Sequence, residues 1–314
     1  MPAHIISIGE CMVELARTTD DAFRLAYGGD TFNTAVYLAR LADVPVAYAT
    51  ALGADPYSDA IVAIAEENRV GTELIVRAEN RMPGLYLIET EAGERTFWYW
   101  RETAPARDYL RLADRARLAE AFASAQFIYL SGITLSLYDA SAREELGALI
   151  DGARKAGTRV VMDSNFRPRG WPGDRDATRK VFADFWQRAD IALPTFDDEQ
   201  ALWDEQDPKE TLSRIVDGGA STVVVKLGDN GALGWSGNNA SLSVPCPETL
   251  EPVDTTAAGD SFNAGFLAAH IAGQDLEESI SFAHDVAAAV IQHRGAIVPK
   301  AATAPLAERL RATA

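Results

Sequence analysis

The sequence predicts an α/β fold in which a mostly parallel sheet has helices on both faces. Short, nearly continuous apolar runs recur along the 314 residues, as expected for strands that are buried on both sides. Segments with helical periodicity separate these runs, and such alternation is typical of parallel sheets. Ligands of these sheets bind beyond the carboxyl ends of the strands, so we expect the functional site there.

The predicted elements alternate from the N-terminus onward. The strands are expected at residues 5–8, 127–130, 160–162, 191–193 and 223–225, and the helices at residues 31–41, 59–67, 141–156, 178–188, 261–272 and 276–293. No repeat of fixed period is visible in the sequence, which argues against solenoids and propellers.

One segment departs from this alternation. Residues 84–100 (GLYLIETEAGERTFWYW) alternate in character around a Glu-Ala-Gly-Glu turn and predict a two-stranded antiparallel hairpin. Its four consecutive rings, Phe97 to Trp100, would lie on both faces. We expect one face to meet substrate or the main domain and the other to meet a partner subunit. An edge hairpin packed on its own domain is the alternative.

Composition narrows the possible partners. The chain has 46 acidic and 29 basic side chains and a net charge of −17, which repels phosphate backbones and anionic membranes. We therefore expect neither nucleic acid nor membranes as partners. No leader or long apolar run is visible, and Cys11 and Cys246 lack metal-type spacing. These features predict a cytoplasmic protein with reduced, packed thiols, in which a glycosylation acceptor at Asn239 has no meaning.

The densest chemical signal is DTTAAGDSF, residues 254–262, at the start of an apolar helix. The small residues Ala257, Ala258 and Gly259 leave their N–H groups uncovered, and the helix adds its positive end, so the segment suits an anion. Asp260 is either an N-cap carboxylate or a base that accepts a proton from an attacking hydroxyl. Beside a phosphate cradle, the second role describes a kinase. The sequence has no P-loop, GxGxxG, DFG or HRD motif.

A second signal is Gly28-Gly29-Asp30-Thr31-Phe32-Asn33, at the entry to the first predicted helix. Paired glycines permit a tight turn and a close ligand, and Asp30 and Asn33 offer polar groups for hydroxyls. Turn and N-cap chemistry alone would also account for these residues.

These two motifs carry a resemblance that covers almost the whole chain. GGDTFNTA and DTTAAGDSFNAGF, in this order, resemble the two signatures of the ribokinase-like (PfkB) carbohydrate kinases. Further fragments resemble the branch of that family that phosphorylates 3-deoxy-2-keto sugar acids: IGECMVEL, NRMPGLYLIET, GERTFWYWR, LSGITLS, DSNFRPR, VVVKLG and HRGAIVP. The resemblance implies a ribokinase-like three-layer αβα fold with a small β-sheet lid. The main domain would comprise residues 1–13, 31–82 and 104–314, and the lid residues 14–30 and 83–103.

The resemblance also implies a role for each matching residue. Asp260 would deprotonate the acceptor hydroxyl, and the N–H groups of Ala257, Ala258 and Gly259 would form the anion hole. The implied substrate residues are Gly29, Asp30, Asn33, Tyr86, Tyr99, Arg101 and Arg167, of which Tyr86, Tyr99 and Arg101 are lid positions. The implied ATP residues, besides the anion hole, are Asn165, Phe166, Arg167, Lys226, Gly228, Gly231 and His284.

The sequence departs from the family pattern at two places. Ala257 stands where the family usually has glycine, so the first cradle position carries a methyl group. Residues 195–198, Thr-Phe-Asp-Asp, stand in place of an Asn-x-x-Glu motif, and there Asp198 would orient Mg²⁺ through water. The resemblance implies ATP and Mg²⁺ as cofactors and leaves activation by a monovalent cation such as K⁺ open.

The implied reaction is ATP-dependent phosphorylation of 2-dehydro-3-deoxy-D-gluconate at its 6-hydroxyl. An arginine fork suits the carboxylate of this substrate. Arg101 and Arg167 are the best-placed basic residues, with surface ion pairs as the alternative. Another family activity (fructokinase, ribokinase or 2-dehydro-3-deoxygalactonokinase-like) is the rival function. A non-catalytic sugar-acid sensor is more remote, because Asp260 is present. The aromatic hairpin predicts a homodimer joined through the lids.

Overall fold

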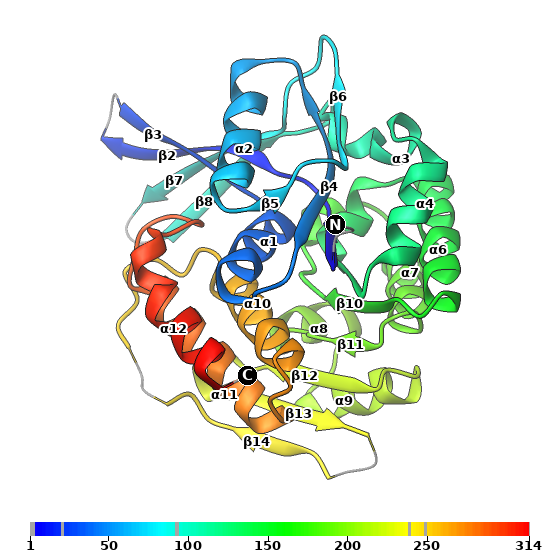
Figure 1. The fold of residues 1–314 in the computed structure, drawn as a ribbon, viewed down its shortest axis with the longest axis vertical. Helices are drawn as coiled ribbons and strands as arrows, with labels where there is room; N and C mark the ends of the chain where they lie inside the picture. The colour runs from blue at the N-terminus through cyan, green and yellow to red at the C-terminus, as the bar shows by residue number, and fades with distance from the viewer. Residues whose placement is uncertain (1–3, 20–21, 92–93, 238–239, 248–249, 314) are drawn as a thin grey trace.

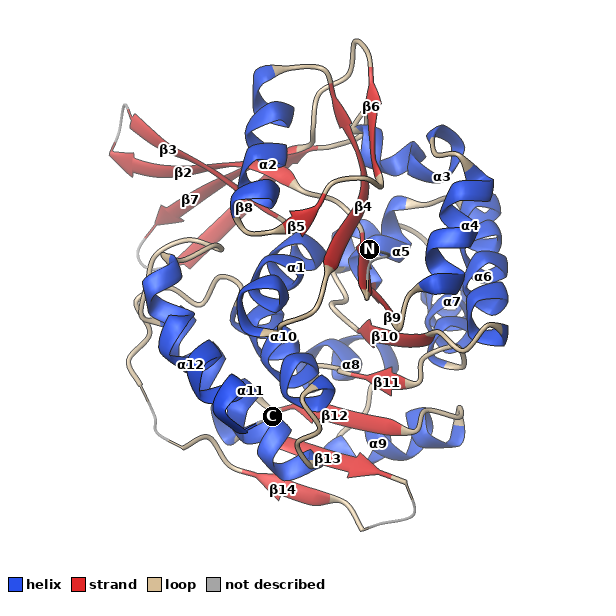
Figure 2. Ribbon diagram, in the orientation of Figure 1, coloured by secondary structure: helices blue, strands red, loops and turns tan. Residues whose placement is uncertain are grey.

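The computed structural model describes residues 4–19, 22–91, 94–237, 240–247 and 250–313, and its largest feature is a ten-stranded sheet (Figures 1 and 2). The strand order is β14-β13-β12-β11-β10-β9-β1-β4-β5, and β6 also pairs with β4. Among the described strands of this sheet, the β12–β13 and β13–β14 pairs are antiparallel and the other pairs are parallel, which confirms a mostly parallel sheet. The strands are β1 Ile5–Ile8, β4 Val46–Gly53, β5 Val70–Gly71, β6 Ile75–Ala78, β9 Phe127–Ser131, β10 Arg159–Asp163, β11 Ile191–Ala192, β12 Thr222–Lys226, β13 Ala232–Ser236 and β14 Leu242–Val244.

The predicted helices are confirmed, with ends that lie within three residues of the expected ones. Six helices begin after an aspartate whose carboxylate accepts a hydrogen bond from a first-turn N–H. No helix in the described ranges is long and apolar enough to cross a membrane. The helices are α1 Asp30–Leu41, α2 Pro56–Glu67, α3 Tyr109–Leu112, α4 Arg115–Ser124, α5 Gly132–Leu137, α6 Ala140–Lys155, α7 Arg175–Trp186, α8 Phe196–Trp203, α9 Pro208–Asp217, α10 Ala258–Ile271, α11 Leu276–Ile291 and α12 Lys300–Thr313.

Two apolar cores lie on opposite faces of the main sheet. Side chains alternate between them along each strand, so Ile5 and Phe127 join one core while Ile6 and Ile128 join the other. Helices α1, α10, α11 and α12 cover the first core, and α3, α4, α6, α7 and α9 cover the second (Figure 1). The three-layer architecture follows directly from strands that are apolar on both sides.

A separate four-stranded sheet, here called the small sheet, has the order β3-β2-β7-β8. Its strands are β2 Met12–Thr19, β3 Ala22–Gly28, β7 Leu85–Glu91 and β8 Glu94–Trp100. The predicted antiparallel hairpin is confirmed as β7–β8, but it is not confined to two strands, because β2 pairs with β7 in parallel. Two strands alone would be marginal, so β2 and β3 supply the missing support. Residues 92–93 of the predicted turn and Asn239 lie outside the described residues, and the domain limits stay a prediction.

The rings of the hairpin point to both faces of the small sheet, as predicted. Tyr86 pairs with Tyr99 across β7 and β8, and both side chains face the main sheet's open edge. Side chains alternate along β8, so Trp98 and Trp100 point to the opposite face. These two residues are 52% and 58% exposed. The small sheet therefore has an aromatic face toward the rest of the chain and an apolar outer face toward solvent.

Candidate active site

A cavity of about 860 Å³ opens at the carboxyl edge of the main sheet, with the small sheet forming one wall. Two of its lining side chains, Asp163 of β10 and Lys226 of β12, are the last residues of their strands, and Ser131, the last residue of β9, bonds the lining residue Asp30. The cavity therefore lies where parallel sheets bind ligands. Its walls include these predicted site residues: Gly29, Asp30, Asn33, Tyr86, Tyr99, Asn165, Arg167, Asp198, Lys226, Gly228, Gly231, Ala257, Ala258, Gly259, Asp260 and His284.

Asp260 lies in the first turn of α10, beside the first turn of α1. The Asn33 side-chain amide donates a 2.8 Å hydrogen bond to Asp260 Oδ2, and the Thr34 hydroxyl donates to the Asp260 carbonyl oxygen at 3.2 Å. The N-cap alternative for Asp260 is wrong, because Ala257 occupies the N-cap position of α10. The carboxylate is therefore available for chemistry rather than committed to the helix end.

The environment of Asp260 holds its pKa near neutrality. Burial raises the pKa of this carboxyl to about 7, and the negative charges of Asp30 and Asp163 act in the same direction. The hydrogen bond from Asn33 and the charge of Lys226 act in the opposite direction. A carboxylate with this pKa can accept a proton near neutral pH and release it again.

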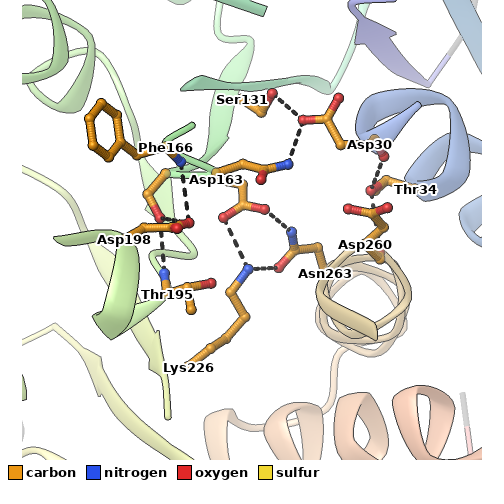
Figure 3. Close-up of polar contacts among 12 residues, drawn as sticks. Asp30, Thr34, Ser131, Asp163, Phe166, Thr195, Asp198, Lys226, Asp260 and Asn263 are labelled. Atoms are coloured by element: carbon orange, nitrogen blue, oxygen red, sulfur yellow. Dashed lines mark hydrogen bonds and ion pairs between the residues drawn. The ribbon is translucent and has the colours of Figure 1, made fainter. Parts of the chain in front are cut away.

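Asp30, the first residue of α1, is held by two side chains from the main sheet edge (Figure 3). Its Oδ2 accepts hydrogen bonds from the Ser131 hydroxyl and from Asn165 Nδ2, the latter at 2.8 Å. Burial raises the pKa of Asp30, whereas the bond from Ser131 lowers it. Asp30 is thus a fixed acceptor on the cavity wall, suited to a sugar hydroxyl.

A buried ion pair between Lys226 and Asp163 lines the cavity (Figure 3). Lys226 Nζ is 3.0 Å from Asp163 Oδ1 and 3.0 Å from Asn263 Oδ1. Asn263 Nδ2 donates to Asp163 Oδ2 at 2.8 Å and to the Tyr129 hydroxyl at 2.9 Å. The three side chains thus close a ring of hydrogen bonds that fixes one ammonium group among several carboxylates.

The anion cradle at the start of α10 depends on a left-handed residue. Ala257 has φ 62° and ψ 17°, a conformation that favours glycine. The N–H of Ala258 donates to the Thr255 carbonyl at 3.2 Å, whereas within the described ranges the N–H groups of Ala257 and Gly259 find no protein acceptor. A Cβ built on Gly259 would have only Lys226 Nζ within 4 Å, at 3.8 Å. An anion in this cradle would therefore meet two N–H groups and an ammonium group.

Arg167 and Asp198 form an ion pair on another wall of the cavity. Arg167 Nη1 is 2.9 Å from Asp198 Oδ1, and the Phe166 N–H donates to Asp198 Oδ2 at 3.2 Å. Burial alone would lower the pKa of Arg167, but the carboxylates of Asp198 and Asp163 raise it overall. The Arg167 side chain is 56% exposed, so its charge faces the open cavity. Phe166 contributes this backbone bond, while its ring is buried in the second core.

Arg101 does not line the cavity. It follows β8, and its guanidinium pairs with the buried carboxylate of Glu10, which comes just after β1. The Tyr99 ring, which does line the cavity, lies with its centroid 5.9 Å from Arg101 Cζ. The alternative of a surface ion pair is therefore wrong for Arg101. The arginine does form an ion pair, but both partners are largely buried.

Three rings of the small sheet form the aromatic wall of the cavity. Tyr86 and Phe97 have ring centroids 6.4 Å apart, and Tyr99 lies 6.0 Å from Tyr86. Arg169 in the main body donates a 2.7 Å hydrogen bond to the Phe97 carbonyl oxygen. This bond ties β8 to the segment that also carries Arg167.

At the other end of the cavity, His284 of α11 meets Cys246. His284 Nδ1 is 3.5 Å from Cys246 Sγ, and its ring packs on Phe262 with centroids 5.1 Å apart. Burial lowers the pKa of His284, so its ring is neutral near pH 7. Gly228 and Gly231 line the same region. Cys11 is buried as expected, but Cys246 is only half-buried and faces the cavity, so its predicted packing is wrong.

The cavity offers limited protein ligands for a metal ion. No group of three or more His, Cys, Asp or Glu side chains with metal-binding geometry occurs in the part of the chain that the structure describes. Asp197 and Asp198 both line the cavity, whereas the adjacent Glu199 is fully buried against Arg214. This donor set fits an ion held mainly by phosphates and water, as is usual for Mg²⁺.

Sequence reasoning missed several residues of the site. Asp163 and Asn263 lie inside the quoted fragments DSNFRPR and DTTAAGDSFNAGF, and their polar character within apolar elements was the available signal. Tyr129 looked like an ordinary residue of a buried strand, and Ser131 lies inside the quoted fragment LSGITLS, which assigned it no role. Glu10 lies inside the quoted fragment IGECMVEL, but nothing there indicates its partner, which is 91 positions away.

Comparison with known proteins agrees with this geometry. Residues 2–303 match the model of the pfkB family carbohydrate kinases. The chain belongs to the pfkB family. The kinase is 41% identical over 308 residues to the 2-dehydro-3-deoxygluconokinase of Escherichia coli, covering 96% of this chain and 99% of that protein. The 2-dehydro-3-deoxygluconokinase of Dickeya dadantii is also 41% identical, over 302 residues that cover 94% and 97% of the two chains.

Solved structures confirm the ribokinase-like fold of the kinase. A fructokinase from Xylella fastidiosa, solved with bound ATP, superimposes with a TM-score of 0.84 at 24% identity. The match covers 99% of this chain and 98% of that one. The expected three-layer architecture is therefore confirmed.

The left-handed Ala257 predicts a stabilising substitution. Ala257→Gly should raise the free energy of unfolding by about 0.5–1 kcal/mol, because glycine adopts a positive φ without the Cβ clash. Ala258→Gly is the matched control: this residue is helical, so glycine should lower the free energy of unfolding by a similar amount. Urea denaturation measures both. Equal destabilisation by the two substitutions would show that Ala257 is unstrained.

Proposed function

We propose that the kinase transfers the γ-phosphoryl group of ATP to the 6-hydroxyl of 2-dehydro-3-deoxy-D-gluconate. The observation that carries this proposal is the juxtaposition of Asp260, a carboxylate with a pKa of about 7, and a helix start where the N–H groups of Ala257 and Gly259 have no acceptor among the described residues. The relatives with 41% identity over nearly the whole chain, named 2-dehydro-3-deoxygluconokinases, support the choice of substrate.

The chemistry follows from the positions of these groups. Asp260 accepts the proton of the acceptor hydroxyl as the hydroxyl oxygen attacks the γ-phosphorus and ADP leaves. The N–H groups of Ala257 and Gly259 stabilise the charge on the moving phosphoryl group, and Lys226 adds a positive charge on the same side. Asp30 and Asn33 hold sugar hydroxyls, which orients the acceptor toward Asp260.

Mg²⁺ enters as the ion that accompanies ATP. Asp198, with Asp197 beside it, would hold the ion through water. When bound, Mg²⁺ neutralises phosphate charge during transfer. Gly228, Gly231 and His284 would border the nucleotide. Activation by K⁺ stays a prediction from the resemblance alone. The use of ATP and the two free cysteines support a cytoplasmic location.

A basic wall supports an acid substrate. In a chain of net charge −17, a carboxylate has to be captured by local cations. Arg167 projects into the cavity, and Arg101 lies directly behind the aromatic wall. Together with Tyr86 and Tyr99, they would enclose the carboxylate end of the sugar acid, while the 6-hydroxyl reaches Asp260.

The raised pKa of Asp260 predicts an acidic limb in the rate profile. The base works only when deprotonated, so kcat/KM should fall about tenfold for each pH unit below its midpoint, which we expect near pH 7. Asp163→Asn removes a nearby negative charge and should move the midpoint to lower pH. Asp260→Asn should lose several orders of magnitude in kcat while keeping its fold. A profile without an acidic limb would contradict the assignment of the base.

Substrate preference tests the proposed function itself. ADP release would be measured with 2-dehydro-3-deoxygluconate, its galactonate epimer, gluconate, fructose and ribose at equal concentrations. We expect the first to be favoured about tenfold or more over the neutral sugars, since only the acids pair with arginine. Preference for fructose or ribose would instead establish another activity of the same family. Absence of turnover with every sugar would favour a sensor.

The arginine that faces the cavity should matter for the acid substrate. Arg167→Ala should lower kcat/KM by a factor equivalent to about 2–5 kcal/mol, because it removes the partner of a charged group. Arg188→Ala is the control, since Arg188 pairs with Asp151 and Asp184 on the protein surface. Wild-type kinetics in Arg167→Ala and Arg101→Ala would refute carboxylate capture by these residues.

We also propose that two copies of the chain associate through the outer face of the small sheet. This face leaves four large apolar side chains 40–58% exposed: Phe23, Leu25, Trp98 and Trp100. A cluster of this kind on a thin sheet is typical of an interaction surface. A second copy is a suitable occupant because the same apolar face would be present on both partners.

If the copies associate through the outer face, substitutions on that face should change the molecular mass measured in solution. Light scattering should give about twice the monomer mass of 33.9 kDa for the wild type. Trp98→Glu combined with Leu25→Glu should give monomers. Leu112→Glu, at another exposed apolar position that lies away from the small sheet, should leave the dimer intact. A monomeric wild type would contradict the proposal.

A further inference from the structure

Glu10 lies at the crossing between the two sheets. It follows β1 of the main sheet and precedes β2 of the small sheet. Its side chain is 1% exposed, so its carboxylate is fully withdrawn from water. The partner in this buried setting is the guanidinium of Arg101, at the end of β8. The ion pair therefore links the end of β1 in the main sheet to the end of β8 in the small sheet.

The ion pair between Glu10 and Arg101 leaves one buried polar atom of each side chain without a hydrogen-bond partner among the described residues. Glu10 Oε2 meets Arg101 Nη2, whereas Glu10 Oε1 and Arg101 Nε are buried and, among the described residues, have no hydrogen-bond partner. Buried polar atoms without partners are uncommon and costly in native proteins. A Cβ on Gly84 would lie 2.9 Å from Oε1 and 3.1 Å from Arg101 Cβ, so the chain keeps this space free for the pair.

The backbone of Glu10 contacts the predicted sugar-binding turn. A Cβ on Gly29 would lie only 2.0 Å from the Glu10 carbonyl oxygen, which excludes every side chain at that position. Gly29 immediately precedes Asp30, whose carboxylate is held on the cavity wall. Glu10 thus packs with its main chain against the turn and binds the arginine behind the aromatic wall with its side chain.

We propose that Glu10 is a positioning residue that holds Arg101 in place for the carboxylate of the sugar acid, without touching the substrate itself. A buried guanidinium needs a counter-ion, and here that ion is fixed to the same backbone that supports the sugar-binding turn. Arg101 itself lies behind the aromatic wall, with its Cζ 5.9 Å from the centroid of the Tyr99 ring that lines the cavity. This inference rests on the proposed function, because it assigns Arg101 to the recognition of an acid.

A double-mutant cycle tests the proposal. Glu10→Ala should raise KM for 2-dehydro-3-deoxygluconate on the order of 30-fold or more. The values of kcat and of KM for ATP should stay within about threefold, since Arg101 does not touch the reacting atoms. Glu10→Gln keeps the shape and one acceptor, so it should lose less. In an Arg101→Ala background, Glu10→Ala should change KM by no more than about twofold, because the group that it positions is absent.

A matched buried pair controls for loss of stability. Glu199 is also fully buried and pairs with Arg214, and its Oε1 has no hydrogen-bond partner in the part of the chain that the structure describes, but it does not line the cavity. Glu199→Gln should lower the melting temperature without raising KM for the sugar acid. If Glu10→Ala does not fold, the cycle is run with Glu10→Gln and Arg101→Lys.

Two results would overturn the proposal, and they are distinguishable. If the wild type turns over the sugar acid but the effects of Glu10→Ala and Arg101→Ala on KM are additive, Glu10 has only a structural role and the proposed function stands. If the wild type prefers a neutral sugar, the proposed function and the role of Glu10 both fail.

Discussion

The ion pair between Lys226 and Asp163 is the interaction on which the rest of the site depends. Three buried aspartates, Asp30, Asp163 and Asp260, lie close together, and the charge of Asp163 acts to raise the pKa of both Asp30 and Asp260. Burying several carboxylates together is costly unless a cation compensates them. Lys226 supplies that charge, and Asn263 fixes it through its hydrogen bonds. Burial, together with this incomplete compensation of the neighbouring carboxylates, raises the pKa of Asp260 to about 7, well above that of an ordinary aspartate.

The two sheets contribute different physical properties to the site. The main sheet is covered on both faces, so side chains at its carboxyl edge, such as Ser131 and Asp163, are held by a rigid frame. The small sheet supplies apolar and aromatic surface, and its inner rings complete a cavity that the main sheet leaves open. A site that excludes water without enclosing the substrate permanently needs both kinds of wall.

The sequence was sufficient for most of the fold because each signal was local. The apolar runs of β1, β9 and β12 and the helices capped by aspartate follow from residues that are neighbours in the chain. The site was predictable where a motif carried it, as for Asp30 and Asp260. The site was not predictable where the position of a side chain depends on an ion pair between distant segments of the chain. Nothing in the sequence indicates that Arg101 pairs with Glu10, since that contact depends on how two sheets meet.

The partners of the site are exceptionally far apart along the chain. Asn33 and Asp260, which share a hydrogen bond, are separated by 227 positions, and the Tyr37 hydroxyl bonds the carbonyl of Ala296, 259 positions later. A ribosome that has completed the main sheet has therefore not yet made the helix that carries the base. Contacts of such long range form late in folding. A nascent chain can build its scaffold before emergence of α10, yet it has no proton acceptor until that helix docks beside α1. Incomplete copies of this protein are thus unable to consume ATP through this site.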